Sequence, residues 1–168
     1  LPDAPIGVVG AGTMGGGIAQ VAAVGGLDVK LYAVADGAAD AARGRIANFL
    51  ERSVARGKTT DAQAGAAISR IDAVSSIQEL GDCFLIIEAV AEKLEIKQDL
   101  FAKLAAVTAP GTVFATNTSS LPVTAIAAGV PQPERVVGMH FFNPVPLMRL
   151  VEVISGMNSS PEALATAR

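Results

Sequence analysis

A glycine pattern directly behind a short apolar segment constrains the fold of this chain more than any other feature. Residues 4–10 form an apolar run typical of a buried parallel strand, and the hexapeptide GAGTMG occupies residues 10–15. In a strand–loop–helix unit with this spacing, the first glycine permits a tight turn, the second lets the backbone approach a pyrophosphate, and the third lets the helix pack closely. Free N–H groups at the helix start favour a phosphate there. The pattern predicts a dinucleotide-binding loop that contains Gly10, Gly12, Thr13, Met14 and Gly15.

Strand-like and helix-like segments alternate along the rest of the chain. The most apolar of them, residues 83–90, predicts a central strand covered on both faces. Other strands are predicted at 28–34, 69–74, 112–116, 135–141 and 150–154, and helices at 13–24, 36–56, 93–107 and 123–128, with a new helix starting at 159–162. This order predicts an α/β fold: a doubly wound, mostly parallel Rossmann-type sheet with helices on both faces.

Charge and cysteine content narrow the class of protein. The net charge of −3 leaves no basic surface for nucleic acid or for a membrane, and no apolar run reaches the roughly 18 residues of a membrane helix. The single Cys83 has no partner for an internal disulfide, which suits a reducing compartment. The chain opens on Leu1-Pro2-Asp3 without an initiator Met, which indicates a trimmed or recombinant fragment. We expect a cytoplasmic protein, or a mitochondrial-matrix protein if a targeting peptide has been removed.

The end of the second predicted strand bears on which nicotinamide cofactor the loop binds. An acidic residue about 20 residues beyond the glycine loop would hold the adenosine ribose hydroxyls, but Ala33 stands there. Asp36 lies three residues later, where a role as helix cap is favoured over a role as ribose ligand. Arg43 lies well inside the predicted helix, so no arginine is expected at the strand tip to favour a 2′-phosphate. NAD is therefore the expected cofactor.

The only histidine, His140, lies at the carboxyl end of a predicted strand, where ligands bind in open α/β sheets. By itself such a histidine is more often structural than catalytic. Glu152 follows in an apolar extended segment, where a carboxylate is costly unless it is paired, and an imidazolium would be a natural partner. The polar turn at residues 116–120 alone indicates a helix cap, and Glu92, Glu95 and Lys97 alone indicate a solvated first turn of helix.

Four motifs, taken together, resemble the N-terminal domain of L-3-hydroxyacyl-CoA dehydrogenases. They are GAGTMGGGIA at 10–19, EAVAEKLEIK at 88–97, TNTSSL at 116–121 and HFFNPVP at 140–146 continued by LVEV at 150–153. The resemblance implies NAD-dependent oxidation of the 3-hydroxyl group of an acyl-CoA substrate, as in fatty-acid β-oxidation. It implies that His140 is the general base, that Glu152 holds the second ring nitrogen, and that Ser119 lies near substrate and nicotinamide. It implies further cofactor contacts at Glu92, Lys97 and Asn143, and no metal.

The resemblance also predicts the domain organisation. Residues 1–158 would form the NAD-binding catalytic domain, and residues 159–168 would start a helix leading to an absent C-terminal helical domain. In the family that domain supplies an asparagine near the substrate carbonyl and most of the interface of a homodimer. We therefore expect a fragment that binds cofactor but turns over acetoacetyl-CoA poorly. CoA phosphates would contact Arg56 or Lys58.

Two alternatives remain open at this point. One is a sugar-acid 3-dehydrogenase of the gulonate type, which has the same fold and many of the same motifs. The other is a non-catalytic NAD-binding module, which Ala33 makes conceivable and which the His140–Glu152 combination argues against, because a sensor has no need of a base.

Overall fold

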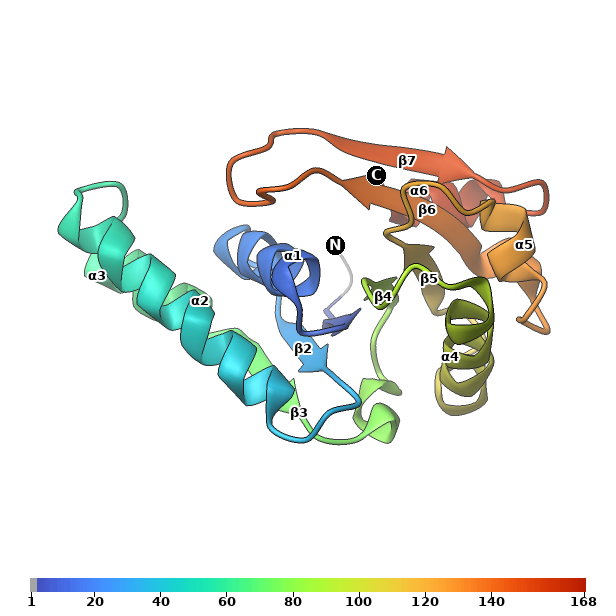
Figure 1. Cartoon of the computed structure of the whole chain (residues 1–168), viewed down its shortest axis with the longest axis horizontal. Coiled ribbons are helices and arrows are strands. Elements are labelled where there is room, and N and C mark those ends of the chain that lie inside the picture. The colour runs from blue at the N-terminus through green and yellow to red at the C-terminus, as the bar shows by residue number, and fades with distance from the viewer. Residues whose placement is uncertain (1–2) are drawn as a thin grey trace.

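The computed structural model describes residues 3–168 as a seven-stranded sheet with helices on both faces (Figure 1). Leu1 and Pro2, on which the expectation of a trimmed start partly rests, lie outside the described residues. The strand order is β3-β2-β1-β4-β5-β6-β7, parallel except for the antiparallel pair β6–β7. The strands are β1 Ile6–Val9, β2 Val29–Tyr32, β3 Ile71–Val74, β4 Leu85–Glu88, β5 Val113–Thr116, β6 Val136–Phe141 and β7 Val151–Ser155. The predicted doubly wound Rossmann-type sheet is confirmed.

The helices form two layers, one on each face of the sheet. They are α1 Thr13–Val24, α2 Ala38–Ala55, α3 Asp61–Ser69, α4 Leu94–Val107, α5 Val123–Ala127 and α6 Pro161–Thr166, with short 3-10 turns at Ile77–Leu80 and Pro133–Arg135. One apolar core lies between the sheet and α1, α2, α3 and α6, and the other between the sheet and α4 and α5. In Figure 1 the first three helices accordingly lie apart from α4 and α5. Among residues 3–168, no helix combines the length and the apolar character needed to cross a bilayer.

The central strands serve both cores because their side chains alternate between the faces of the sheet. In β4, Leu85 and Ile87 belong to the core beneath α1, whereas Ile86 belongs to the core beneath α4. All four residues of β4 are buried, which explains the uninterrupted apolar run. β7 lies at the edge of the sheet and is largely exposed.

Two features of the helices differ from expectation. Helix α2 begins after Gly37, which is its N-cap with a φ of +71° and provides no side-chain cap, so the prediction that Asp36 caps the helix is wrong. Helix α3 was not predicted, because its apolar face is small: Ala67 is buried, and only Ala64 and Ile68 pack partly against the core beside it. Its sequence signal is the capping box of Thr60 and Gln63. The helix start predicted at 159–162 is confirmed: α6 begins at Pro161, and the Ser160 hydroxyl caps it by accepting a hydrogen bond from the Ala163 N–H at 3.1 Å.

Candidate functional site

The glycine loop between β1 and α1 is shaped for a phosphate ligand. Gly10 has a φ of +112°, and a Cβ there would lie 2.4 Å from the Ala89 carbonyl oxygen. A Cβ on Gly15 would lie 1.7 Å from the Gly10 carbonyl oxygen, so only glycine lets α1 start this close to the strand. Gly12 is the N-cap of α1, faces open space and gives the helix no side-chain cap. The first N–H groups of α1 therefore have no side-chain cap as acceptor, and the loop fits the pyrophosphate of a dinucleotide.

The end of β2 lies directly beside this loop, because the Gly10 N–H donates to the Tyr32 carbonyl oxygen at 2.9 Å. Ala33 follows Tyr32 and brings no carboxylate to this place. Arg45 reaches the loop from α2 instead, and its Nη2 donates to the Ala11 carbonyl oxygen at 2.8 Å. Sequence reasoning missed Arg45, because a position two turns into a helix gives no sign of where a long side chain ends.

His140 and Glu152 face each other across the only antiparallel strand pair in residues 3–168. They are direct partners in the β6–β7 register, and His140 Nδ1 lies 2.8 Å from Glu152 Oε2. The His140 side chain is 20% exposed and its ring lies 4.6 Å from that of Phe142. With Nδ1 engaged by the carboxylate, Nε2 is the ring nitrogen left to exchange a proton with a ligand.

A cavity of about 350 Å³ brings together five predicted site residues from separate parts of the sequence. Five of the residues that line it were predicted from the sequence: Met14, Glu92, Ser119, His140 and Asn143. Its other lining residues are Ala89, Val90, Asn117, Phe141 and Phe142. The cavity therefore extends from the start of α1 to the histidine. This follows from the topology, since the carboxyl ends of parallel strands meet at one edge of the sheet.

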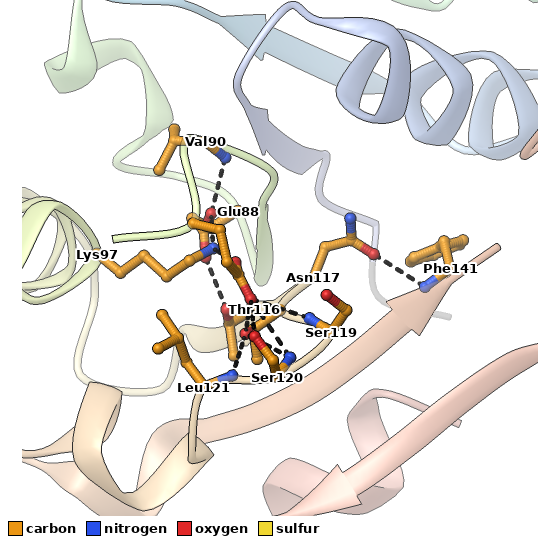
Figure 2. A network of polar contacts seen from close by, with 11 residues as sticks. Glu88, Val90, Lys97, Thr116, Asn117, Ser119, Ser120, Leu121 and Phe141 are labelled. Atoms are coloured by element: carbon orange, nitrogen blue, oxygen red, sulfur yellow. Dashed lines mark hydrogen bonds and ion pairs between the residues drawn. The ribbon is translucent and has the colours of Figure 1, made fainter. Parts of the chain in front are cut away.

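Lys97 does not line this cavity, although the sequence analysis assigns it to the cofactor. Its side chain is 1% exposed, and its ammonium lies 2.6 Å from Glu88 Oε1 (Figure 2). The same ammonium lies 3.1 Å from Glu92 Oε2. Glu88, which is 0% exposed, also accepts hydrogen bonds of 2.7 Å from the Val90 N–H and from the Thr116 hydroxyl. Lys97 is thus part of a buried network that joins β4, β5 and α4, and the alternative of a solvated helix turn does not apply to it.

Glu92 links that network to the loop after β5. Its carboxylate accepts hydrogen bonds from the Thr118 hydroxyl and from the Ser119 N–H, the latter at 3.1 Å. Partial burial alone would raise the pKa of Glu92, but the hydrogen bonds from Thr118 and Lys97, the Lys97 charge and the Ser119 N–H together lower the pKa to about 2. Glu92 is therefore ionised at neutral pH and fixes the backbone that carries Ser119.

The same loop is tied to the histidine strand by Asn117, whose side-chain oxygen accepts a hydrogen bond of 2.9 Å from the Phe141 N–H (Figure 2). Phe141 is the neighbour of His140 in β6. The positions of Ser119 and His140 are consequently coupled through Asn117. The TNTSSL turn taken by itself predicted a helix cap, and nothing in its sequence indicated this link.

A second, larger hollow of about 870 Å³ lies at the C-terminal end of α1, between α2, α3 and the loop before β7. Its charged lining residues within the described chain are all basic: Arg52, Arg56, Lys58 and Arg70. Phe49 and Leu147 add exposed apolar surface. A hollow with this lining suits a ligand that combines phosphates with apolar groups.

Comparison with known proteins gives consistent results. The family model described as "3-hydroxyacyl-CoA dehydrogenase, NAD binding domain" matches residues 5–168. A probable 3-hydroxybutyryl-CoA dehydrogenase of Deinococcus radiodurans is 46% identical over 156 residues, which are 93% of this chain and 56% of that protein. The crystal structure of 3-hydroxybutyryl-CoA dehydrogenase from Escherichia coli K12 has a TM-score of 0.95 at 45% identity, covering 99% of this chain and 35% of that one. For FadB2 of Mycobacterium tuberculosis the TM-score is 0.92 at 42% identity, with 96% and 57% covered. The chain thus spans between about a third and somewhat over half of the length of these relatives.

Proposed function

Because the chain belongs to the 3-hydroxyacyl-CoA dehydrogenase family, whose NAD-binding domain it matches, we propose that it carries the cofactor-binding and proton-transfer part of an enzyme that oxidises the 3-hydroxyl group of a 3-hydroxyacyl-CoA. The observation that carries the proposal is the His140–Glu152 contact of 2.8 Å at the cavity that reaches the glycine loop. A base held by a carboxylate beside a nucleotide-binding loop suits the oxidation of an alcohol, because it can take the hydroxyl proton as the hydride leaves.

His140 acts as general base in this proposal. Its Nε2 would accept the proton of the 3-hydroxyl group, and bound NAD would supply the acceptor for the hydride that leaves carbon 3. Glu152 holds Nδ1–H, which keeps the imidazole in the tautomer with a free Nε2 and stabilises the positive charge that forms. Ser119 lines the same cavity and offers its hydroxyl to substrate and nicotinamide.

The cofactor contacts divide into two groups. Gly10, Gly12, Thr13, Met14 and Gly15 bind the pyrophosphate at the start of α1. Glu92, Ser119 and Asn143 line the cavity on the nicotinamide side. Lys97 is enclosed by Glu88 and Glu92, so we propose that it positions Glu92 and does not itself contact the cofactor.

The substrate would be an acyl-CoA. Arg56 and Lys58 line the basic hollow beside α2 and provide charge for CoA phosphates, as the resemblance implies. In support, the relatives compared above include proteins named 3-hydroxybutyryl-CoA dehydrogenase. Fatty-acid metabolism is the corresponding setting, and the lone thiol Cys83 fits a cytoplasmic location.

We further infer that residues 1–158 form the NAD-binding catalytic domain and that residues 159–168 lead into a helical C-terminal domain. The greater length of the relatives supports this division. A homodimer formed through that C-terminal domain is part of the same proposal. The 168-residue chain would then bind cofactor and reduce acetoacetyl-CoA poorly by itself.

His140→Gln in the full-length protein tests the proposed chemistry. General-base catalysis contributes about 10²–10⁴, so turnover of 3-hydroxybutyryl-CoA should fall by at least about 100-fold. NADH binding, followed by nucleotide fluorescence, should stay unchanged, because His140 is proposed to act on the substrate hydroxyl. Unchanged turnover would contradict the role of His140, and a parent protein that oxidises sugar acids but not acyl-CoA would contradict the substrate class.

A further inference from the structure

We propose that this chain accepts NADP(H) as well as NAD(H), and that Arg45 contacts the 2′-phosphate of NADP(H). The inference rests on the proposed nucleotide-binding function and deepens it. It is carried by three residues at one place: Ala33 at the end of β2, Ala11 in the glycine loop, and Arg45 from α2.

The adenosine ribose of a nucleotide bound to a Rossmann-type loop lies beside the residue that ends the second strand. Here the Gly10–Tyr32 hydrogen bond places that residue, Ala33, next to the loop. A carboxylate at this position would accept hydrogen bonds from the ribose hydroxyls and would repel a 2′-phosphate. Ala33 does neither, so the main electrostatic barrier to NADP(H) is missing.

Arg45 brings positive charge to the same place. Its Nη2 bonds the Ala11 carbonyl oxygen at 2.8 Å, which holds the guanidinium at the loop while the side chain stays exposed. That is the only hydrogen bond Arg45 makes within the described part of the chain, and a guanidinium has five N–H donors. Donors therefore remain for a phosphate, which guanidinium groups bind well.

Arg43, two positions earlier on α2, shows that this arrangement is specific to Arg45. Its Nε donates to the Ile71 carbonyl oxygen at 2.8 Å and its Nη2 to the Ile68 carbonyl oxygen at 3.3 Å. Arg43 thus joins α2 to the start of β3 and is committed to structure. Of the two arginines, only Arg45 contacts the glycine loop.

The competing candidate at this edge is Asp36. It is exposed, lies three residues beyond Ala33, and does not cap α2, so its carboxylate is available to ribose hydroxyls. If Asp36 replaces the missing acid at the strand end, NADPH will bind much more weakly than NADH. Our proposal predicts instead that NADPH and NADH bind with similar affinity.

The test is a pair of fluorescence titrations of the 168-residue chain with NADH and with NADPH. We expect dissociation constants within about tenfold of each other for the unaltered chain. Arg45→Ala should weaken NADPH binding by about tenfold or more and NADH binding much less, since a hydrogen bond to a charged group is lost only with NADPH. Ala33→Asp should weaken NADPH binding selectively. Lys103→Ala on α4, which removes one exposed positive charge elsewhere, is the matched control and should change neither constant.

Three outcomes would overturn the inference. NADPH binding more than about tenfold weaker than NADH binding in the unaltered chain would show that the site rejects the 2′-phosphate. Equal weakening of both nucleotides by Arg45→Ala would show that Arg45 contacts a group that the two share. Binding of neither nucleotide would overturn the proposed function as well, whereas NADH binding without NADPH binding would overturn the inference alone.

Discussion

Replacing Lys97 by Met tests whether the network behind the candidate site stabilises the fold. Lys97 and Glu88 are 1% and 0% exposed and their charged atoms lie 2.6 Å apart. Removal of one partner from a buried pair costs about 3–5 kcal/mol, because the other charge stays buried without compensation. Glu88 keeps the Val90 N–H and the Thr116 hydroxyl as donors, so we expect the lower end of that range, about 3 kcal/mol.

Urea unfolding followed by circular dichroism measures this loss. With a urea m value of about 2 kcal/mol/M, a loss of about 3 kcal/mol lowers the midpoint by about 1.5 M. The matched control is Lys103→Met, the same substitution on the same helix in a pair of the same length. Lys103 Nζ lies 2.6 Å from Asp99 Oδ2, but the two side chains are 63% and 64% exposed. Exposed pairs of this kind contribute about 0.5 kcal/mol or less, so the control midpoint should hardly move.

A double variant separates loss of charge balance from loss of packing. Glu88→Gln combined with Lys97→Met removes both charges, so it should cost less than the sum of the two single changes. The proposed role of the Glu88–Lys97 pair is contradicted if Lys97→Met destabilises the chain no more than Lys103→Met does. It is also contradicted if the double variant loses as much unfolding free energy as the two single variants together.

Three further measurements follow from the structure. Glu152→Gln in the full-length protein should lower kcat by at least about tenfold while NADH binding stays the same, because the amide no longer stabilises a charged His140; an unchanged kcat would count against the proposed pairing. Acid unfolding should show the contribution of Glu92 to the unfolding free energy, because the pKa of Glu92 is lowered from 4.5 to about 2 in the folded chain. Such a lowered pKa stabilises the fold above pH 4.5, and this contribution is lost as the pH falls from 4.5 towards 2. Between pH 4.5 and 2, the unfolding free energy of Glu92→Gln should depend less on pH than that of the unaltered chain. The same pH dependence in both proteins would contradict this role of Glu92. Cys83 should resist Ellman's reagent at pH 8 until the chain unfolds, since burial, together with the Asp82 charge, raises the pKa of its thiol to about 12; rapid labelling of the folded chain would refute this.

The parts of the fold that sequence patterns predicted are those set by local chemistry. The loop glycines, the apolar run of β4 and the helix start at 159–162 each depend on a few neighbouring residues, and the structure has each at its predicted place. The Asp36 cap was wrong because Gly37, with its positive φ, supplies the turn before α2. Helix α3 was not predicted because its apolar face consists of two alanines and one isoleucine, which is too weak a pattern to identify a helix from the sequence.

The candidate site was predictable where it depends on strand ends and not where it depends on long side chains. His140 and Glu152 could be paired because each lies in a recognisable extended segment, and the structure brings their side chains together. The roles of Lys97 and Arg45 depend on where a flexible side chain ends, which helix position alone does not determine. Lys97 turns inward to Glu88, and Arg45 crosses to a loop more than 30 positions earlier in the sequence.

The same network that stabilises the fold also determines the geometry of the site. Glu88 sits at the end of β4, and through Lys97 it places Glu92, whose carboxylate holds the Ser119 backbone. Asn117 in that loop then holds the Phe141 N–H next to His140. A change at Lys97 should therefore disturb the cavity even though Lys97 does not line it. We expect Lys97→Met to lower the unfolding free energy and to weaken nucleotide binding at the same time. Glu92→Gln leaves the buried Glu88–Lys97 pair intact, so it should cost less stability than Lys97→Met while still loosening the loop that carries Ser119.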